Sequence, residues 1–172
     1  MLSMGFLVAD RTSRPVYMSA TLLPEMLTSM SECVADVTPA VPWSPWFDSL
    51  TGARSAGEPV LEVGVHVSDV EPLMADLQAA DAVADRLARR LPLGPGERLG
   101  YELVGYDPGG WHTWLCLGGL VEDTFAATGV RPGRDGLIES EPAARRAATW
   151  LTESGRGDPK VFLWIPALLT RP

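Results

Sequence analysis

Short apolar segments typical of β-strands alternate along this chain with segments whose apolar residues recur at helical spacing. The strand-like segments are residues 4–9, 59–67, 99–106 and 161–165. The helix-like segments are residues 21–37, 68–91 and 111–128, and a further one that begins after Ser140. This alternation favours an α/β or α+β fold in which one mixed sheet packs with about four helices as a single-domain sandwich. The chain has 172 residues, of which 46% are apolar, so residues 1–172 suffice for one globular domain with a sizeable core.

The charge balance of the chain favours some partners and disfavours others. There are 14 basic and 22 acidic residues, which give a formal net charge of −8. Proteins that bind nucleic acid neutralise its phosphates with lysine and arginine, so we expect no nucleic-acid partner. An acidic surface instead attracts basic surfaces, and we expect the partner to be another protein with a basic surface.

The sequence contains no recognisable targeting or membrane-spanning segment. Its N-terminal region lacks the cationic start of a signal peptide, and no stretch approaches the roughly 20 apolar residues that span a membrane. The two cysteines, Cys33 and Cys116, can form at most one bridge, and we expect them to be free thiols. We therefore expect a cytoplasmic protein with no membrane partner, either a monomer or a homodimer.

Residues 39–58 combine a Pro/Trp-rich segment with a candidate mobile loop. Three prolines are interleaved there with Trp43 and Trp46, which excludes a long regular element, and residues 51–58 are mostly small or polar. Exposed tryptophans beside a mobile loop would form a binding lip, because aromatic side chains are prominent among interface hot spots. Buried tryptophans would instead attach this irregular segment to the core. The sequence leaves both interpretations open.

The most distinctive block is YDPGGWHTWLC, residues 106–116, in which a Gly-rich turn precedes a segment expected to be helical. On a helix, His112 and Cys116 would share one face at positions i and i+4, where the histidine would lower the thiol pKa and create a nucleophile. Asp123 lies about 16 Å beyond His112 along such a helix and cannot complete a triad. A free cysteine is more commonly a small buried hydrophobic residue. We assign no catalytic residue and keep the Cys116–His112 pair as an alternative.

Residue spacing gives no support for a metal or nucleotide site. The chain has two histidines and two cysteines, and none of them falls in a C-x-x-C or H-x-x-x-H pattern. The G-x-G-x-x-G and Gly-Lys-Ser/Thr fingerprints of nucleotide-binding loops are also missing. We therefore expect no metal ion and no cofactor.

Three stretches carry a resemblance to known proteins: TLLPEMLTSMSECVADVTPAVPW, LGYELVGYDPGGWHTWLCLGGLVEDTFAATGVRPGRDGLI and FLWIPALL. In order and spacing they resemble a family of small, acidic, uncharacterised bacterial proteins, and they cover most of the chain. Small acidic single-domain proteins of this sort are similar to the immunity proteins of bacterial toxin systems, which bind and block a partner toxin. The resemblance implies a protein-binding function and assigns no catalytic residues.

Two functions remain open at this point beside a purely structural or scaffolding role, and the sequence does not decide whether the protein is an enzyme. The first is a cytoplasmic, immunity-like protein-binding module that neutralises a partner through its acidic surface, with tryptophan anchors at Trp43, Trp46, Trp111 and Trp114. The alternative is a small enzyme or small-molecule-binding protein with a pocket around Trp111, His112, Trp114 and Cys116. Alanine at Cys116 or His112 would abolish the second function and leave the first intact.

Overall fold

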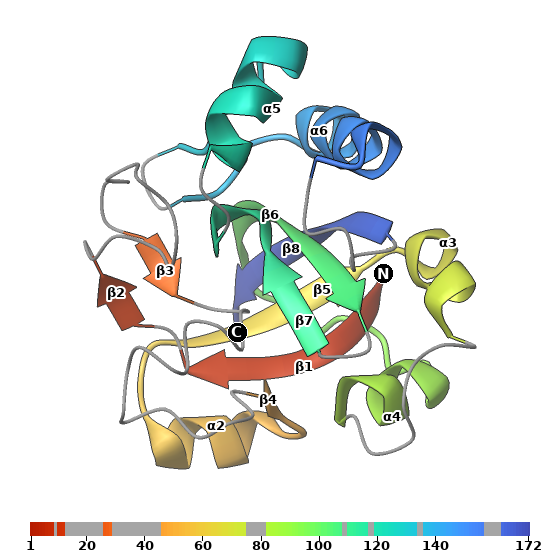
Figure 1. Ribbon diagram of the computed structural model, residues 1–172. Helices are drawn as coiled ribbons and strands as arrows, with labels where there is room; N and C mark the ends of the chain where they lie inside the picture. Colours follow the sequence, from red (N-terminus) through yellow and green to blue (C-terminus); the bar gives the residue numbers. More distant parts are fainter. Residues whose placement is uncertain are drawn as a thin grey trace.

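The computed structural model describes residues 1–8, 10–12, 26–28, 46–74, 82–107, 110–116, 119–133, 136–156 and 163–172 (Figure 1). Its strands are β1 (Leu2–Val8), β2 (Asp10–Thr12), β3 (Met26–Thr28), β4 (Trp46–Phe47), β5 (Val60–Val65), β6 (Glu97–Asp107), β7 (Gly110–Thr113) and β8 (Leu163–Arg171). Its α-helices are α2 (Leu50–Ala56), α3 (Val67–Val70), α4 (Ala82–Ala88), α5 (Leu120–Thr128) and α6 (Glu141–Ser154). Two short 3-10 helices are η1 (Glu71–Leu73) and η2 (Trp114–Cys116).

Six strands form one curled sheet in the order β4-β1-β5-β8-β6-β7, and every neighbouring pair in it is antiparallel. The strands β2 and β3 pair with each other separately. The fold is therefore α+β, one of the two classes expected, but the expected mixed sheet is wrong. Only two residues separate β6 from β7, which permits a hairpin and no parallel crossover, and the longer connections also return their strands in the opposite direction. The described ranges contain five α-helices instead of about four.

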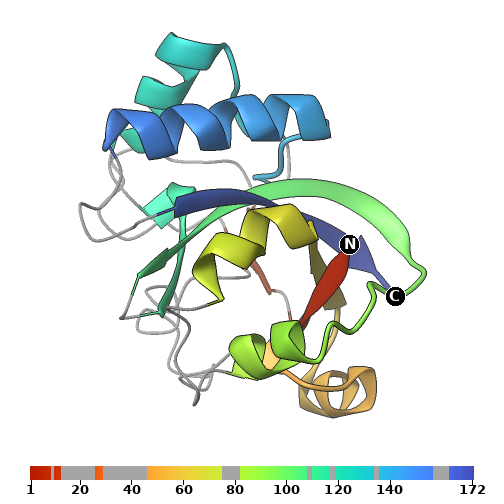
Figure 2. The same cartoon turned by 90° about the vertical axis from the view of Figure 1, so that its right-hand side faces the viewer.

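Helices lie on both sides of this sheet. Figure 2 shows α5 and α6 together on its convex side, whereas α2 and α4 lie on the opposite side. The core accordingly has two parts. The concave cluster consists of Leu2, Met4, Leu7, Trp46, Leu61, Val63, Val65, Val70, Leu73, Val83, Leu87, Val104, Tyr106, Trp111, Leu137, Ile165, Ala167 and Leu169. The convex cluster consists of Tyr101, Leu103, Trp114, Leu115, Leu120, Val121, Val130, Ile138, Ala144, Ala147, Ala148, Leu151, Trp164 and Leu168.

Two glycines contribute to the curl of the sheet. The register between β1 and β5 shifts at Gly5, and the register between β6 and β8 shifts at Gly100. Such bulges bend a strand and increase its twist. Both glycines have positive φ values, +138° and +150°, and a Cβ at Gly100 would lie 2.9 Å from Cβ of Leu137. A larger residue at Gly100 would therefore be both strained and crowded.

Two expectations for the N-terminal part of the chain are wrong. Residues 26–28 lie within a segment expected to be helical, yet they form β3 and pair with β2. Residues 50–56 lie largely within the expected mobile loop, yet they form α2, whose first turn is capped by a 3.1 Å hydrogen bond from Gly52 N–H to Ser49 Oγ. The neighbouring residues 29–45, which include Cys33 and Trp43, lie outside the described residues.

Within the segment expected to be one long helix, residues 68–91, the described residues form α3, η1 and α4. The N-cap of α3 is His66, and no side chain of the described residues caps this helix. The Ser68 hydroxyl contacts Asp69 Oδ1 at 3.4 Å. Apolar residues of all three pieces lie in the concave cluster, namely Val70, Leu73, Val83 and Leu87.

Among the described residues, the four predicted strands, the helix after Ser140 and the C-terminal half of the helix predicted over residues 111–128 are confirmed. β1, β5, β6 and β8 coincide with the four strand-like segments, although β8 extends well beyond residue 165. α6 begins directly after Ser140, with Pro142 in its first turn, and ends at Gly155. Gly155 has a φ of 61°, the left-handed conformation typical of a helix C-terminus.

Candidate functional site

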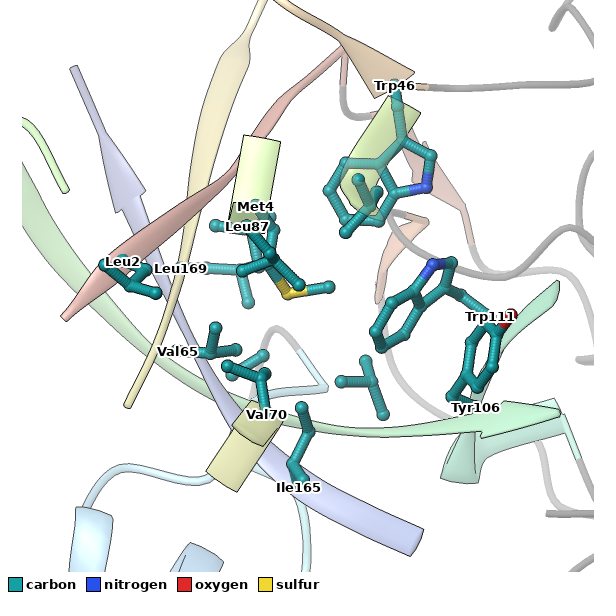
Figure 3. Close-up of a cluster of buried hydrophobic side chains, with 14 of the residues drawn as sticks. Leu2, Met4, Trp46, Val65, Val70, Leu87, Tyr106, Trp111, Ile165 and Leu169 are labelled. Carbon is teal, nitrogen blue, oxygen red and sulfur yellow. The ribbon is translucent and has the colours of Figure 1, made fainter. Parts of the chain in front are cut away.

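Three of the four tryptophans expected as surface anchors are core residues. Trp46 is 8% exposed, Trp111 1% and Trp114 0%. Trp46 and Trp111 come from β4 and β7, the two edge strands of the curled sheet, and Figure 3 shows their indole rings in the same interior space. Large side chains at these two edges fill the concave side of the sheet. Of the two interpretations that the sequence left open, packing in the core therefore holds for these three residues, which are not available as surface anchors, and Trp43 lies outside the described residues.

The helix expected to align His112 with Cys116 is not formed. His112 lies in strand β7, opposite Gly105 of β6, and Cys116 ends the 3-10 helix η2. Because β7 ends at Thr113 and η2 is a separate 3-10 helix, His112 and Cys116 do not lie on the face of one α-helix. Trp111 and Trp114, which were expected to line one pocket, belong to the concave and convex clusters respectively. The helical alignment that a Cys116–His112 catalytic pair required is therefore not present. The two tryptophans expected beside that pair also do not share one cluster.

A groove of about 320 Å³ instead opens between α6, the α3–η1 segment and the first half of β8. Its polar lining residues are Ser68, Asp69, Arg145, Thr149, Thr152 and Glu153. Its apolar lining comes from Pro72, Ala148 and residues 163–166. The groove thus combines side chains that are far apart in the sequence.

The groove exists because β5 covers only part of β8. β5 pairs with residues 168–170 of β8 and then ends, so that the chain turns into α3. β6, on the other side of β8, pairs with it from Leu163 onward. The outer edge of residues 163–166 therefore faces the groove instead of another strand.

Hydrogen bonds elsewhere in the sheet fix the direction of this edge. Tyr101 of β6 exchanges two backbone hydrogen bonds with Ile138, of 2.8 and 2.7 Å. Tyr101 therefore points away from β8, and its partner Leu168 must direct its own N–H and C=O away from β6. Alternate residues share one direction along a strand, so the backbone of residues 164 and 166 also points away from β6 and toward the groove.

Where β8 lines the groove, at the buried residues Trp164 and Pro166, neither residue has an N–H left to donate. The N–H of Trp164 donates to Thr152 Oγ1 at 3.1 Å. Pro166 has no N–H at all. What remains toward the groove is the carbonyl oxygens of Trp164 and Pro166.

Arg145 links α6 to α3 beside the groove. Its Nη1 lies 2.9 Å from Asp69 Oδ1, and its Nε lies 2.9 Å from Glu141 Oε1. Hydrogen bonding to Asp69 raises the pKa of Arg145, and hydrogen bonding from Arg145 lowers the pKa of Glu141. Two carboxylates thus offset one guanidinium, and exposed Glu153 adds a further negative charge to the groove wall. The groove is acidic despite its arginine.

Two further side chains contact the carboxylate of Glu141. His66 Nε2 lies 3.1 Å from Glu141 Oε1, and the Tyr101 hydroxyl donates to Oε2 at 3.3 Å. Burial raises the pKa of Tyr101, so its hydroxyl remains a donor. These contacts tie the first turn of α6 to β6 and to the end of β5.

No sequence pattern marked Asp69, Arg145 or Glu153 as a candidate site residue. The pairing of Glu141 with Arg145 has a sequence signal, because the two residues stand four apart on a helix. Asp69 precedes Arg145 by 76 positions, and only the folded structure brings them together.

No other kind of site emerges from the residues that the structure describes. Within them, no group of three or more His, Cys, Asp and Glu side chains could hold a metal ion. None of the helices described is long and apolar enough to cross a bilayer. Comparison with protein-family models, with curated proteins and with solved structures finds no match to the chain. The groove and the charge of the chain are therefore the basis for inferring function.

Proposed function

We propose that this protein is a cytoplasmic, immunity-like protein-binding module whose groove receives part of a basic partner protein. The observation that carries the proposal is the composition of the groove, a recess of about 320 Å³ with an acceptor-only strand edge and an excess of carboxylates. Such a surface attracts groups that donate hydrogen bonds and carry positive charge.

The net charge of the whole chain also favours a basic partner. A net charge of −8 accelerates the approach of a basic protein and disfavours association between copies of the chain. The resemblance of three stretches to small acidic proteins that are similar to immunity proteins also supports a protein partner. The proposal no longer uses Trp46, Trp111 and Trp114 as anchors, because these side chains are buried.

The groove would be the centre of a larger contact surface. Specific interfaces bury about 800 Å² on each partner, far more than a recess of this size supplies. Exposed residues beside the groove would form the rim, with Glu71 on η1 and Thr149 and Glu153 on α6. A polar rim around a recessed centre is the usual arrangement of such interfaces.

Zero-length cross-linking with a carbodiimide, in cells that naturally make the protein, tests this proposal. The reagent joins carboxylates to amines, and the chain has a single lysine, Lys160, so cross-links between its own copies are confined to that residue and the N-terminal amine. We expect cross-linked peptides that join Glu71 or Glu153 to lysines of one foreign protein. The purified partner should then bind with an affinity that falls several-fold as salt is raised, because exposed charges are screened.

Variants separate this function from the alternative enzyme. Cys116→Ala and His112→Ala should leave the affinity for the captured partner unchanged, whereas Glu153→Gln should weaken it. Cross-links that reach only Lys160 or the N-terminal amine, or a partner whose affinity ignores salt, would contradict the proposal.

A further inference from the structure

We infer that the partner group which enters the groove is the guanidinium of an arginine side chain. This inference rests on the proposed function and names the chemistry that the same groove recognises. It follows from three properties of the described residues: the direction of the β8 edge, the charge of the groove and the nature of its apolar wall.

The strand edge selects a ligand that only donates hydrogen bonds. An added β-strand would need donors and acceptors in alternation from β8. Thr152 already occupies the N–H of Trp164, and Pro166 has none, so this edge cannot pair with another strand in the usual way. The two carbonyl oxygens that remain are about 7 Å apart along the strand, since each residue advances about 3.3 Å.

The groove also selects positive over negative charge. Arg145 is the cation of the lining, and Asp69 and Glu141 already hold it at 2.9 Å each. The second oxygen of Asp69, Oδ2, is buried and has no hydrogen-bond partner in the described part of the chain. That carboxylate and the exposed Glu153 leave a negative potential that disfavours a carboxylate or phosphate ligand.

A guanidinium matches these acceptors better than an ammonium does. It carries five N–H donors in one rigid plane and can reach two carbonyl oxygens and a carboxylate together, whereas an ammonium concentrates three donors at a point. The three methylenes of an arginine would lie against the apolar side of the groove, which Pro72, Leu163 and Ile165 provide.

A titration followed by nuclear magnetic resonance tests the inference on the intact chain. The probes are N-acetyl-arginine amide, its uncharged isostere N-acetyl-citrulline amide, and N-acetyl-lysine amide. We expect the arginine probe to produce saturable shifts at the amides of Thr149, Thr152 and Trp164. The citrulline probe should bind at least about fivefold more weakly, because it lacks the charge that strengthens these hydrogen bonds. The lysine probe should also be weaker.

Two charge-neutralising variants locate the binding. Glu153→Gln should weaken the arginine probe by about threefold, the usual size of one exposed charge interaction. The matched control is Glu139→Gln, which makes the same change at an exposed position outside the groove lining and should leave the affinity unchanged. Equal binding of the arginine and citrulline probes, shifts that lie outside the groove, or no saturable shift would each overturn the inference.

Failure of this inference can be distinguished from failure of the proposed function. A cross-linked basic partner that binds in a salt-dependent way, while the arginine probe does not bind, overturns the inference and leaves the proposed function standing. If the arginine probe binds in the groove while no foreign partner is cross-linked, the proposed function is overturned, and so is the inference that a partner protein supplies the arginine. That result would point to a free guanidinium compound as the ligand.

Discussion

Arg86 and Arg145 each attach a helix to the rest of the protein, but their surroundings differ. Arg86 extends from α4, where its Nη1 lies 3.0 Å from Asp48 Oδ1 and also donates to the Asp48 carbonyl. Its Nη2 donates to Ser3 Oγ at 2.9 Å, and its guanidinium lies 5.3 Å from the centre of the Phe6 ring. The side chain of Arg86 is 6% exposed, whereas that of Arg145, beside the groove, is 38% exposed.

This difference in burial separates a structural contact from a contact beside a binding surface. Around Arg86, protein atoms replace water, so the buried hydroxyl of Ser3 depends on the guanidinium for a partner, whereas the Asp48 carboxylate is 61% exposed and also pairs with Arg89. Around Arg145, water can take over part of each contact, and the same openness lets a ligand approach. Among the described residues, Arg86 forms one ion pair, with Asp48, and Arg145 forms two, so the number of ion pairs would rank the two arginines in the opposite order to their burial.

The largest expected effect comes from removing the buried arginine. Arg86→Ala should lower the free energy of unfolding by about 2–3 kcal/mol, because Ser3 Oγ and the Asp48 carbonyl lose a buried donor. Urea denaturation of both proteins measures this. The matched control is Arg54→Ala, since Arg54 pairs with Glu58 at 3.6 Å and is 53% exposed. That variant should stay within about 0.5 kcal/mol of the parent. Equal losses at the two positions would remove burial as the explanation.

A smaller effect is expected at the groove. Arg145→Gln should lower the free energy of unfolding by about 1 kcal/mol, because both of its ion pairs are partly exposed. The loss should be local: amide hydrogen exchange should accelerate in α3, which Arg145 holds through Asp69, and should remain unchanged in α4. A loss as large as that of Arg86→Ala, or faster exchange in α4, would contradict the distinction between the two arginines.

The helices and strands with complete local signals were predictable from the sequence. α6 has a polar residue before it, a proline in its first turn, alanines and leucine at buried spacing, and glycine after its last turn. All of these signals agree, and the helix forms where they place it. The strand-like segments that become β5 and β6 were likewise recognisable, because each is an apolar run that ends at turn residues.

Residues 111–116 show why periodicity alone was insufficient. Trp111 and Trp114 stand three apart, as on a helix, and both are buried, but each enters a different cluster. Residues 110–113 instead pair with β6 as strand β7, with Asp107 opposite Gly110. Pairing with β6 decided the structure, and the helical spacing was coincidental.

The groove could not be predicted, because no local sequence pattern encodes it. It depends on β5 ending before β8 does, and on α3 returning Asp69 to Arg145. Strand lengths relative to one another, and contacts over 76 positions, are properties of the tertiary fold. The sequence supplied the overall acidity that such a groove uses, and nothing in it marked the location.

The smallest expected effect is a pH dependence that separates the two arginines further. Hydrogen bonding from Arg145 lowers the pKa of Glu141 from its usual 4.5, and hydrogen bonding from Arg86 lowers the pKa of Asp48 from its usual 3.8. A lowered folded-state pKa contributes stability above the unfolded value, and this contribution is lost as the pH falls through the folded value. The destabilisation by Arg145→Gln should therefore shrink as the pH is lowered below 4.5.

The destabilisation by Arg86→Ala should respond less to acid. Its hydrogen bonds to Ser3 and to the Asp48 carbonyl do not titrate, so most of the loss should persist below pH 3.8, where Asp48 begins to be protonated in the unfolded chain. Urea denaturation of the parent and both variants, from neutral pH down to about pH 3, measures the two differences. If the Arg145→Gln difference stayed constant over this range, the ion pairs of Arg145 with its two carboxylates would contribute nothing to stability, and Arg145 would act through packing alone.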